Sequence, residues 1–484
     1  MKLNNPVLLR SQCLINGEWC DALSGKREAV INPATGAELA SIPLVSEEET
    51  QQAIAAAQRA QNDWKQLTAK QRSALLLAWA DKVLAAQEDL AQLMTAEQGK
   101  SLAEARGEVA YAASFITWFA EEAKRVDGAV LQAPQASQRL VVVKQPIGVC
   151  AAITPWNFPA AMITRKVAPA LAAGCAIIVK PAEQTPLTAL ALAKLAQDAG
   201  IPAGVLQVVT GEAAQVGKVL CDSPVVRKLS FTGSTEVGRI LMAQCAPSIK
   251  KLSLELGGNA PVIVFDDANL DAAVAGIMAS KFRNSGQTCV CANRIYVQDG
   301  IYERLAEKLV AAVEQLNVGD GSQEGTTQGP LIDSDAVAKV QSHIDDALIK
   351  GAQIATGGQP HALGGTFFQP TVVTGVTQKM RFAKEETFGP VAPLFRFHDE
   401  AEAIAMANDT EFGLAAYLFT QNAARQWRVP EALEYGMVGI NTGLISNEVA
   451  PFGGVKQSGL GREGSRYGIE EYLELKYLCI DVSC

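Results

Sequence analysis

Apolar residues in the first third of the chain recur at steps of three and four positions, which is the period of an amphipathic helix. The clearest stripe consists of Leu75, Leu76, Trp79, Val83 and Leu84. Residues 46–49 form a capping-box pattern ahead of an alanine-rich segment, and another helix is expected from residue 101 to about residue 124. These stripes predict a helical region whose apolar faces pack into a core.

From Gly148 the pattern changes to short apolar runs that are separated by helical segments. We expect strands at residues 148–153, 175–179, 205–209 and 226–230. Apolar strands that alternate with helices predict a parallel sheet covered on both faces. Such a sheet binds ligands at the carboxyl ends of its strands.

A second alternating block begins after Gly257 and Gly258. Residues 261–265 form a predicted strand, residues 270–282 fit a helix with Asn269 as its N-cap, and further α/β segments run to about residue 441. We therefore place a domain boundary at residues 255–258. The β-rich segment at residues 139–145 fits neither alternation and is a candidate arm.

Composition and charge argue against a nucleic-acid-binding protein and against a membrane protein. The chain has 484 residues, of which 48% are hydrophobic and 19% charged, and its formal net charge is −9. This balance is typical of a globular protein, and the negative charge argues against nucleic acid or an anionic membrane as the main partner. The longest apolar stretch, residues 167–179, is shorter than the roughly 20 residues of a membrane span, and the N-terminus has no signal-peptide pattern.

The ten cysteines show no framework spacing, so we expect reduced thiols in a cytoplasmic protein. Cys289 and Cys291 form the only close pair, and the three histidines, His343, His361 and His398, are remote from them in sequence. Because C-x-C is not zinc-finger spacing, we expect no metal site.

Cys289 follows a run of small and polar residues that is too polar for a core strand. Polar loops on rigid scaffolds are where catalytic residues concentrate, although most cysteines are inert buried residues. Glu255 stands in an apolar strand beside two glycines, where burial would raise its pKa; a salt-bridged residue at a strand end is the alternative. A thiolate that attacks a carbonyl and a carboxylate that activates water are the elements of covalent catalysis.

Three further segments follow predicted strands. Residues 154–159 contain two prolines, which fix a rigid turn, and Asn157, which can offer an amide N–H to an oxyanion or be a plain turn residue. Residues 180–183 occupy a position where an adenosine ribose could lie. Residues 231–238 supply glycines and backbone N–H groups at a helix start, which suits a phosphate. Residues 459–464 match G-x-G-x-x-G, but they follow no strand and leave too little chain for a βαβ unit, so we reject them as a dinucleotide fingerprint.

Seven segments together resemble the aldehyde dehydrogenase superfamily. They are residues 155–159, 180–183, 231–234, 255–258, 286–289, 385–390 and 451–454. The resemblance covers nearly the whole chain, and seven motifs in family order make it specific. Within the superfamily, residues 161–166, 281–284, 289–294 and 441–446 resemble the bacterial succinate-semialdehyde dehydrogenases.

The resemblance implies an aldehyde-dehydrogenase-like α/β fold. A Rossmann-type dinucleotide-binding domain would comprise residues 1–127 and 147–256, and a catalytic domain residues 257–447. Residues 128–146 and 448–484 would form β arms that bridge subunits. The family pairs such arms in a homodimer or homotetramer.

The resemblance also implies a role for each matching residue. Cys289 attacks the aldehyde to give a thiohemiacetal, and hydride transfer to the nicotinamide leaves a thioester. Asn157 and the backbone N–H of Cys289 hold the oxyanion, and Glu255 activates the water that releases the acid. The implied cofactor-binding residues are Thr154, Pro155, Trp156, Lys180, Glu183, Gly233, Ser234, Leu256, Glu386 and Phe388.

Arg165 and Arg283 lie near Asn157 and Cys289 in sequence. On their own they are typical solvated surface arginines, but with the resemblance a cationic pair near the thiol suits an aldehyde that ends in a carboxylate. Ser446 would add a hydrogen bond. The expected substrate is succinate semialdehyde, with glutarate semialdehyde as the alternative, since one methylene group discriminates by only about 1–3 kcal/mol.

Glu183 stands where enzymes of this type that prefer NADP often have a small residue, commonly serine. Its carboxylate can accept hydrogen bonds from both ribose hydroxyls but repels a 2′-phosphate. We therefore expect NAD to be preferred, with NADP as the alternative because Lys180 can pair with a phosphate.

Other hypotheses remain open at this point. An acylating dehydrogenase would pass the thioester to coenzyme A, but Glu255 argues for water. A thiol hydrolase or acyltransferase would use Cys289 without redox chemistry, and a non-catalytic binding protein would not need Cys289 and Glu255. Cys291 is a candidate partner for Cys289 in a regulatory disulfide, with simple packing as the alternative.

Overall fold

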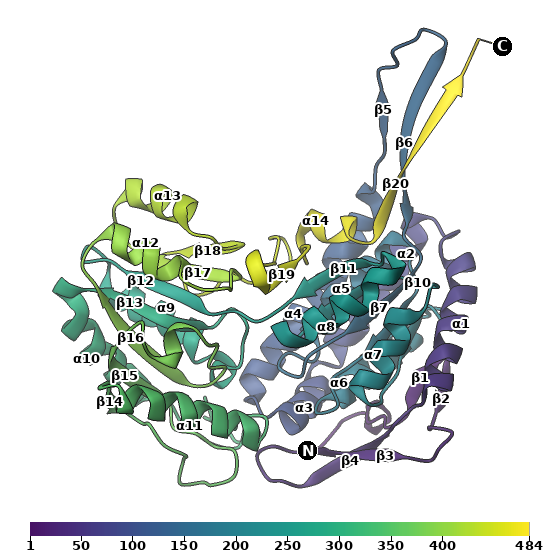
Figure 1. The fold of residues 1–484 in the computed structure, drawn as a ribbon. Helices are drawn as coiled ribbons and strands as arrows, with labels where there is room; N and C mark the ends of the chain where they lie inside the picture. The colour runs from purple at the N-terminus through teal and green to yellow at the C-terminus, as the bar shows by residue number, and fades with distance from the viewer. Residues whose placement is uncertain (484) are drawn as a thin grey trace.

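Within residues 1–483, which the computed structural model describes, two large β-sheets flanked by helices form the body, and a three-stranded arm projects from it (Figure 1). The first sheet and its helices come from the N-terminal half of the chain, apart from one short strand at residues 459–460, and the second sheet follows residue 258. The predicted α/β architecture with parallel sheets is therefore confirmed.

The first sheet contains the four strands predicted after Gly148 and has the order β19-β11-β10-β7-β8-β9-β1-β2. Its strands are β1 (Cys13–Ile15), β2 (Glu18–Cys20), β7 (Val149–Ile153), β8 (Ile177–Lys180), β9 (Leu206–Val208), β10 (Val226–Thr232), β11 (Lys251–Glu255) and β19 (Gly459–Leu460). Strands β7 to β11 run parallel, and β1 and β19 pair antiparallel with them. The pattern did not predict β1, β2 or β19, because two or three residues are too few to show an alternation.

Helices α1 to α8 pack around the first sheet. They are α1 (Glu47–Trp64), α2 (Ala69–Ala85), α3 (Gln87–Gln98), α4 (Leu102–Glu122), α5 (Ala161–Ala173), α6 (Pro186–Asp198), α7 (Ala213–Asp222) and α8 (Thr235–Cys245). Ser46 begins α1 with the predicted capping box, and Ser101, the predicted start of the fourth helix, begins α4 with a second capping box. Alternate residues of β7 enter separate cores, with Cys150 on one face and Ala151 on the other, because successive strand side chains point to opposite sides.

The second sheet has the order β14-β15-β16-β13-β12-β17-β18. Its strands are β12 (Ala260–Val264), β13 (Ala292–Gln298), β14 (Gln353–Thr356), β15 (Thr371–Val376), β16 (Val391–Phe397), β17 (Ala415–Phe419) and β18 (Met437–Ile440). Its helices are α9 (Leu270–Lys281), α10 (Tyr302–Val313), α11 (Ser334–Ile349), α12 (Glu400–Asn408) and α13 (Ala423–Ala432). Asn269 caps α9 as predicted, since its side chain accepts hydrogen bonds from two backbone amides of the first turn.

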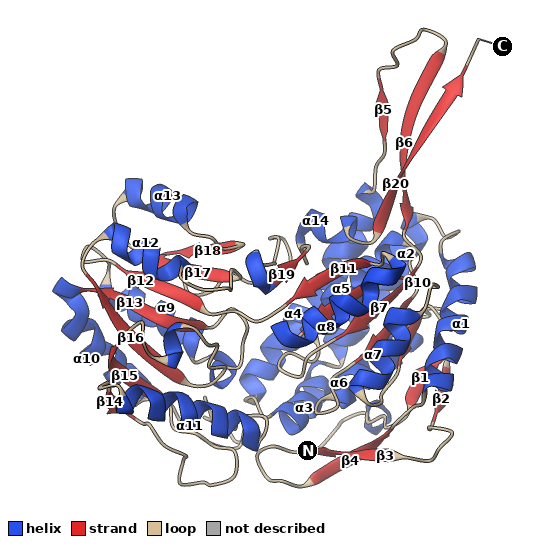
Figure 2. Cartoon of the chain, viewed as in Figure 1, coloured by secondary structure: helices blue, strands red, loops and turns tan. Residues whose placement is uncertain are grey.

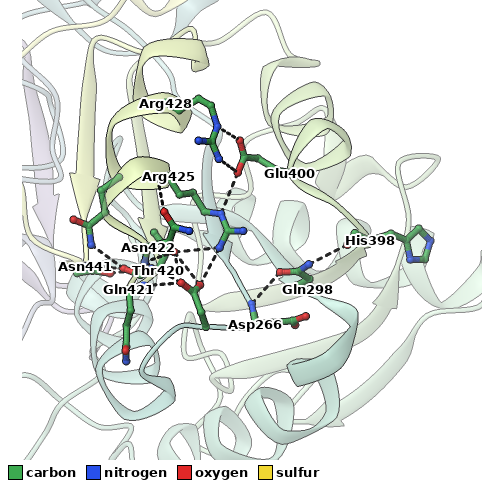
Figure 3. Close-up of polar contacts among 12 residues, drawn as sticks. Asp266, Gln298, His398, Glu400, Thr420, Gln421, Asn422, Arg425, Arg428 and Asn441 are labelled. Atoms are coloured by element: carbon green, nitrogen blue, oxygen red, sulfur yellow. Dashed lines mark hydrogen bonds and ion pairs between the residues drawn. The ribbon is translucent and has the colours of Figure 1, made fainter.

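A polar network closes the carboxyl edge of the second sheet, where β12 and β17 end side by side (Figure 3). Asp267 accepts hydrogen bonds from the Thr420 hydroxyl and from the next two backbone amides, at the start of α13. Arg425 joins Asp267 to Glu400 through ion pairs. Parallel sheets often bind ligands at such a position, where the strand order reverses. Here a carboxylate of the protein itself occupies the helix N-terminus.

The arm consists of β5 (Ala129–Leu131), β6 (Gln138–Pro146) and β20 (Leu473–Asp481). The last two strands pair antiparallel over their whole length and extend well beyond the body (Figure 2). The hairpin of β3 (Arg27–Ile31) and β4 (Glu38–Pro43) lies at the opposite end of the body, and α14 (Ser465–Glu470) precedes β20. In the described chain, residues 1–483, no helix has both the length and the apolar character needed to span a membrane.

Candidate active site

The candidate site lies where the carboxyl edge of the first sheet faces the amino edge of the second. A cavity of about 290 Å³ occupies this junction. Its lining includes Pro155, Trp156, Asn157, Gly233, Ser234, Glu255, Leu256, Cys289, Glu386 and Phe388. All of these are residues that the sequence predicts for the site, and the fold brings them together from loops that are far apart in the chain.

Cys289 lies in a loop ahead of β13 whose backbone is left-handed at Asn284, Ser285 and Gly286 in succession. A Cβ on Gly286 would lie 2.1 Å from the backbone oxygen of Gly389, so only glycine fits there. This turn brings the half-buried thiol to the cavity. Burial raises the pKa of the Cys289 thiol to about 12. The resting group is therefore a protonated thiol.

Glu255 ends β11, on the edge of the first sheet that faces the thiol. Its side chain is buried, and neither carboxylate oxygen has a hydrogen-bond partner among the described residues. Burial raises the pKa of Glu255 well above its ordinary value, and the Glu463 carboxylate raises it further, against the opposing charges of Arg165 and Lys166. An unbonded carboxyl group with a raised pKa, in the same cavity as a thiol, suits a general base.

Asn157 follows β7 and connects the loops of the two sheets. Its Nδ2 donates a 3.0 Å hydrogen bond to the backbone oxygen of Gln287, and its Oδ1 has no partner within residues 1–483. The backbone oxygen of Asn157 accepts hydrogen bonds from Lys100 Nζ at 2.8 Å and from Asn284 Nδ2 at 3.0 Å. Because the amide has two protons and uses one, the second is available to a ligand oxygen.

The other end of the cavity combines a helix N-terminus with a buried carboxylate. Ser234 caps α8, so the positive end of the helix dipole lies at the cavity lining. Glu386 accepts a 3.0 Å hydrogen bond from the backbone amide of Gly258, and burial raises its pKa to about 7. The rings of Trp156 and Phe388 pack edge to face with centroids 5.5 Å apart. These groups can hold a phosphate, a ribose and a flat ring, respectively.

Sequence reasoning missed the start of α11, which also lines the cavity. Asp333 and Lys339 both lie there. Charged residues on an amphipathic helix are usually solvated, so the pattern gives no signal of a site. On the same helix, His343 contacts the Thr387 hydroxyl and the Glu385 carboxylate, each at 3.2 Å. These contacts anchor the loop that carries Glu386 and Phe388.

Glu183 lines a neighbouring cavity of about 680 Å³ that shares Ile332 and Asp333 with the first. Two further glutamates, Glu28 and Glu212, line it as well, so that with Asp333 the lining holds four carboxylates. Burial raises the pKa of Glu28, and the Glu183 carboxylate raises it further. This end of the cleft is therefore strongly acidic.

Lys180 and Thr154 belong to the lining of neither cavity. Lys180 ends β8, is buried and forms an ion pair with Glu183. Thr154 is buried after β7, and its backbone amide donates a 3.1 Å hydrogen bond to the Lys180 carbonyl. Lys180 therefore contacts the acidic end of the cleft only through its ion pair with Glu183.

The alternative in which both arginines are solvated surface residues is wrong for Arg165. Arg165 lies on α5, is buried, pairs with Glu463 and packs over the ring of Phe452 at 4.2 Å. Its Nη2 has no hydrogen-bond partner in the described chain. Arg283 is half-buried and lies over the ring of Phe158 at 4.9 Å. Both guanidinium groups are therefore packed against aromatic rings.

Two other residues near this pair had no signal in the sequence. Glu463 pairs with Arg165 and Lys166, which precede it by almost 300 positions, so no local pattern joins them. The hydroxyl of Tyr111 is buried near Arg165, and both arginines lower the pKa of Tyr111 against the raising effect of burial. The predicted contact Ser446 is half-buried in the loop after β18, outside the cavity lining.

Cys291 is buried beside α9. Its thiol donates a 3.1 Å hydrogen bond to the backbone oxygen of Lys281, at the end of that helix. Both Cys289 and Cys291 are free thiols in this structure. Packing accounts for Cys291 in this state, and the regulatory disulfide stays a prediction.

Comparison with known proteins agrees with this geometry. The aldehyde dehydrogenase family model matches residues 19–478. The chain is 65% identical to the succinate-semialdehyde dehydrogenase [NADP(+)] GabD of Escherichia coli, covering 99% of this chain and 100% of that protein. It is 64% identical to the glutarate-semialdehyde dehydrogenase of Pseudomonas putida, covering 100% of both chains.

Among solved structures, the succinate-semialdehyde dehydrogenase of Burkholderia pseudomallei matches with a TM-score of 0.99 and 63% identity. This match covers 100% of both chains. The likeness therefore extends over the sheets, the arm and the loops that line the cavity. The chain belongs to the aldehyde dehydrogenase family.

Proposed function

We propose that this protein oxidises succinate semialdehyde to succinate with a nicotinamide dinucleotide as the oxidant. The observation that carries the proposal is the shared cavity: Cys289 from one sheet and Glu255 from the other line it together, with the Asn157 amide between their loops. A thiol, a base and an oxyanion donor in one cavity are what acyl transfer through a thioester requires.

Each residue of the chain has a defined task in this scheme. The Cys289 thiol gives its proton to solvent and its sulfur attacks the aldehyde carbon. The Asn157 amide and the Cys289 backbone N–H stabilise the thiohemiacetal oxyanion that forms. When bound, the nicotinamide ring supplies the acceptor for the hydride that leaves this carbon. Glu255 then takes a proton from the water that attacks the thioester, which releases the acid and restores the thiol.

The lining fits such a cofactor. The N-terminus of α8 at Ser234, with Gly233 before it, suits the pyrophosphate, and the Glu386 carboxylate suits the hydroxyls of the nicotinamide ribose. The rings of Trp156 and Phe388 and the side chain of Leu256 bound the same space. We assign the adenosine ribose to Glu183 and Lys180, next to Thr154 and Pro155. The first-sheet half would then be the dinucleotide-binding domain and the second-sheet half the catalytic domain.

The substrate proposal rests on the buried Arg165 and the half-buried Arg283. Arg165 keeps a buried Nη2 without a partner, and Arg283 lies beside the loop of Cys289. A buried donor without a partner is costly, and a carboxylate of the ligand would satisfy it. Ser446 would add a hydrogen bond. Relatives named for succinate semialdehyde and for glutarate semialdehyde are about equally similar to this chain, so the longer substrate is the second candidate.

For the cofactor, we propose that NAD is preferred over NADP. Glu28, Glu183 and Glu212 line the cavity proposed for the adenosine ribose. Lys180, which lies behind this lining rather than in it, already pairs with Glu183. With Asp333 the lining holds four carboxylates, which would repel a 2′-phosphate but not two hydroxyl groups. The Escherichia coli relative is named for NADP(+), so this chain would differ from it at this point.

We also propose a homodimer or homotetramer assembled through the arm. Apolar side chains are exposed along its strands, namely Val130, Leu131, Leu475, Tyr477 and Ile480. Apolar groups gathered on a projecting element usually mark an interaction surface. The reducing cytoplasm is the proposed location, because the reaction needs Cys289 as a free thiol.

The test is a panel of aldehydes with the purified enzyme. Succinate semialdehyde, glutarate semialdehyde and butanal are each combined with NAD or NADP, and reduced cofactor is followed by its near-ultraviolet absorbance. We expect the carboxylated aldehydes to be preferred. Arg283→Ala should raise KM for them by about tenfold or more, as expected for a lost charged hydrogen bond, and leave KM for butanal nearly unchanged.

Two outcomes would overturn the proposal. If Arg283→Ala and Arg165→Gln lower kcat/KM for butanal as much as for the carboxylated aldehydes, these residues do not bind a carboxylate. If no aldehyde gives reduced cofactor while Cys289 is still acylated by an activated ester, the protein is a thiol hydrolase or acyltransferase instead.

A further inference from the structure

A fully buried ion pair lies beside the site but outside the groups that the proposed reaction uses. Lys100 Nζ is 2.5 Å from Glu108 Oε2, and both side chains are 1% exposed. Removing two charges from water costs several kcal/mol for each ion, so such a pair persists only where its other bonds are satisfied. Those other bonds lead directly to Asn157.

Glu108 and Lys100 hold the two ends of the loop around Asn157. The Oε1 atom of Glu108 accepts hydrogen bonds from the backbone amides of Ala160 at 2.9 Å and Ala161 at 3.2 Å, at the start of α5. Lys100 Nζ donates a 2.8 Å hydrogen bond to the backbone oxygen of Asn157 itself. The pair therefore fixes the peptide from which the proposed oxyanion donor extends.

The same helix, α4, also holds the loop of the thiol. Glu104, one turn before Glu108, accepts a 2.7 Å hydrogen bond from the backbone amide of Asn284. The side chain of Asn284 in turn donates to the Asn157 backbone oxygen at 3.0 Å. One turn of α4 thus sets the position of Asn157 relative to the loop that carries Cys289.

Lys100 reaches toward the substrate arginine as well. Its Nζ lies 3.9 Å from the centroid of the Phe158 ring, on which Arg283 also packs, at 4.9 Å. A cation close to an aromatic face is attracted by the ring quadrupole, so Lys100 helps to keep this ring in place. Lys100 would then help to position both Asn157, at the carbonyl end of the bound aldehyde, and Arg283, at its carboxylate end.

We propose that Lys100 and Glu108 are positioning residues for the oxyanion site. They hold the Asn157 backbone so that its side-chain amide meets the substrate oxygen as charge develops there. This inference rests on the proposed dehydrogenase function. Its physical basis is that a displacement of about 1 Å in a reacting geometry can cost roughly 10²-fold in rate.

The chain contains a matched control in Glu97. This glutamate is also buried in the same half of the protein, and it caps the start of α6 through the backbone amides of Leu187 at 2.7 Å and Thr188 at 2.8 Å. It makes the same kind of bonds as Glu108, but none of its hydrogen bonds reaches Asn157 or Lys100. Glu97→Gln and Glu108→Gln therefore disturb two similar helix starts, and Glu108 also pairs with the lysine that is bonded to Asn157.

The experiment compares Lys100→Met, Lys100→Arg, Glu108→Gln and Glu97→Gln in the full-length enzyme. Each variant is measured for Tm, for the pre-steady-state rate of NADH formation with succinate semialdehyde, for KM of NAD, and for the rate of Cys289 alkylation by iodoacetamide. Alkylation needs the thiol but no oxyanion site, so it separates a misplaced amide from a damaged loop.

We expect Lys100→Met and Glu108→Gln to lower the rate of NADH formation by about 10- to 100-fold, while KM of NAD and the alkylation rate change by less than about twofold. Lys100→Arg should recover part of the rate. Glu97→Gln should lower Tm and leave the rate close to that of the wild type. If Lys100→Met does not fold, the rates of NADH formation of Glu108→Gln and Lys100→Arg test the proposal instead.

The inference is overturned if Glu97→Gln and Glu108→Gln lose rate in proportion to their loss of Tm, or if alkylation falls in step with the rate. It is also overturned if both Lys100 variants keep the wild-type rate. These results differ from a failure of the proposed function, in which the wild-type enzyme itself forms no NADH with any aldehyde.

Discussion

Asn157 Nδ2 lies 3.0 Å from the backbone oxygen of Gln287, two residues before Cys289. This hydrogen bond joins a loop of the first sheet to a loop of the second. It orients the amide so that one proton is used within the protein and the other is available in the cavity. The spacing between the proposed oxyanion donor and the thiol therefore depends on a bond between the two halves of the molecule.

Asn157→Ala should lower kcat by about 10²–10³-fold, which is the usual cost of removing one oxyanion donor. KM for NAD should change little, because the groups proposed to hold the cofactor are untouched. Steady-state kinetics measures both. Asn157→Asp should be at least as damaging, since a carboxylate would repel both the Gln287 carbonyl and the oxyanion. A variant that keeps more than a tenth of the wild-type kcat contradicts the assignment.

The reaction of the cofactor-free enzyme with iodoacetamide should depend steeply on pH. The thiolate is the nucleophile, and the Cys289 pKa is raised to about 12, so the thiolate fraction rises about tenfold per pH unit between pH 7 and 10. Mass spectrometry of the modified peptide measures the rate, with Cys289→Ser as the unreactive control. A plateau below pH 9 would show that the resting thiol is already ionised.

Glu183→Ser should improve the use of NADP. Removing this carboxylate leaves Lys180 free of its ion-pair partner, so kcat/KM for NADP should rise by about tenfold or more, which corresponds to one charged contact. Comparison of kcat/KM for the two cofactors measures it. Glu212→Gln lines the same cavity without pairing to Lys180 and should have a smaller effect. A wild-type enzyme that already prefers NADP strongly would refute the cofactor proposal.

Gly258→Ala should inactivate the enzyme. A Cβ at this position would lie 2.4 Å from the backbone oxygen of Cys289, so the thiol loop would have to move. Gly107→Ala is the matched control, because a Cβ there meets nothing within 4 Å and alanine favours the helix. We expect normal kcat and an equal or higher Tm for that control. Equal activity of both variants would show that the loop tolerates displacement.

Local patterns predicted the elements that local interactions determine. The capping box at Ser46, the N-cap Asn269 and the strands after Gly148 are all present, because caps and apolar alternation act over a few residues. The polar segments that follow predicted strands also predicted several residues of the cavity lining, among them Asn157 and Ser234. The residues that follow strands of the first sheet are grouped because the carboxyl ends of parallel strands share one edge, whereas Cys289 comes from a loop at the amino edge of the second sheet.

The missed features depend on partners that are distant in sequence. Lys166 and Glu463 are 297 residues apart, and Lys100 is 57 residues from Asn157. The misjudged exposure of Arg165 has the same cause, since Glu463 and Phe452 enclose it from the far end of the chain. Hydropathy treats a lone arginine as a surface residue, and only the folded chain supplies the counter-charge that permits its burial.

The pairing of β19 with β11 has a consequence for synthesis on the ribosome. β11 ends in Glu255, and its outer neighbour is supplied by residues 459–460. Until those residues leave the exit tunnel, the nascent chain carries this strand with open backbone groups on one side, a template for wrong pairing. A message truncated shortly before codon 459 would therefore yield a polypeptide that contains the Cys289 loop but lacks β19, the strand that pairs with β11 next to Glu255.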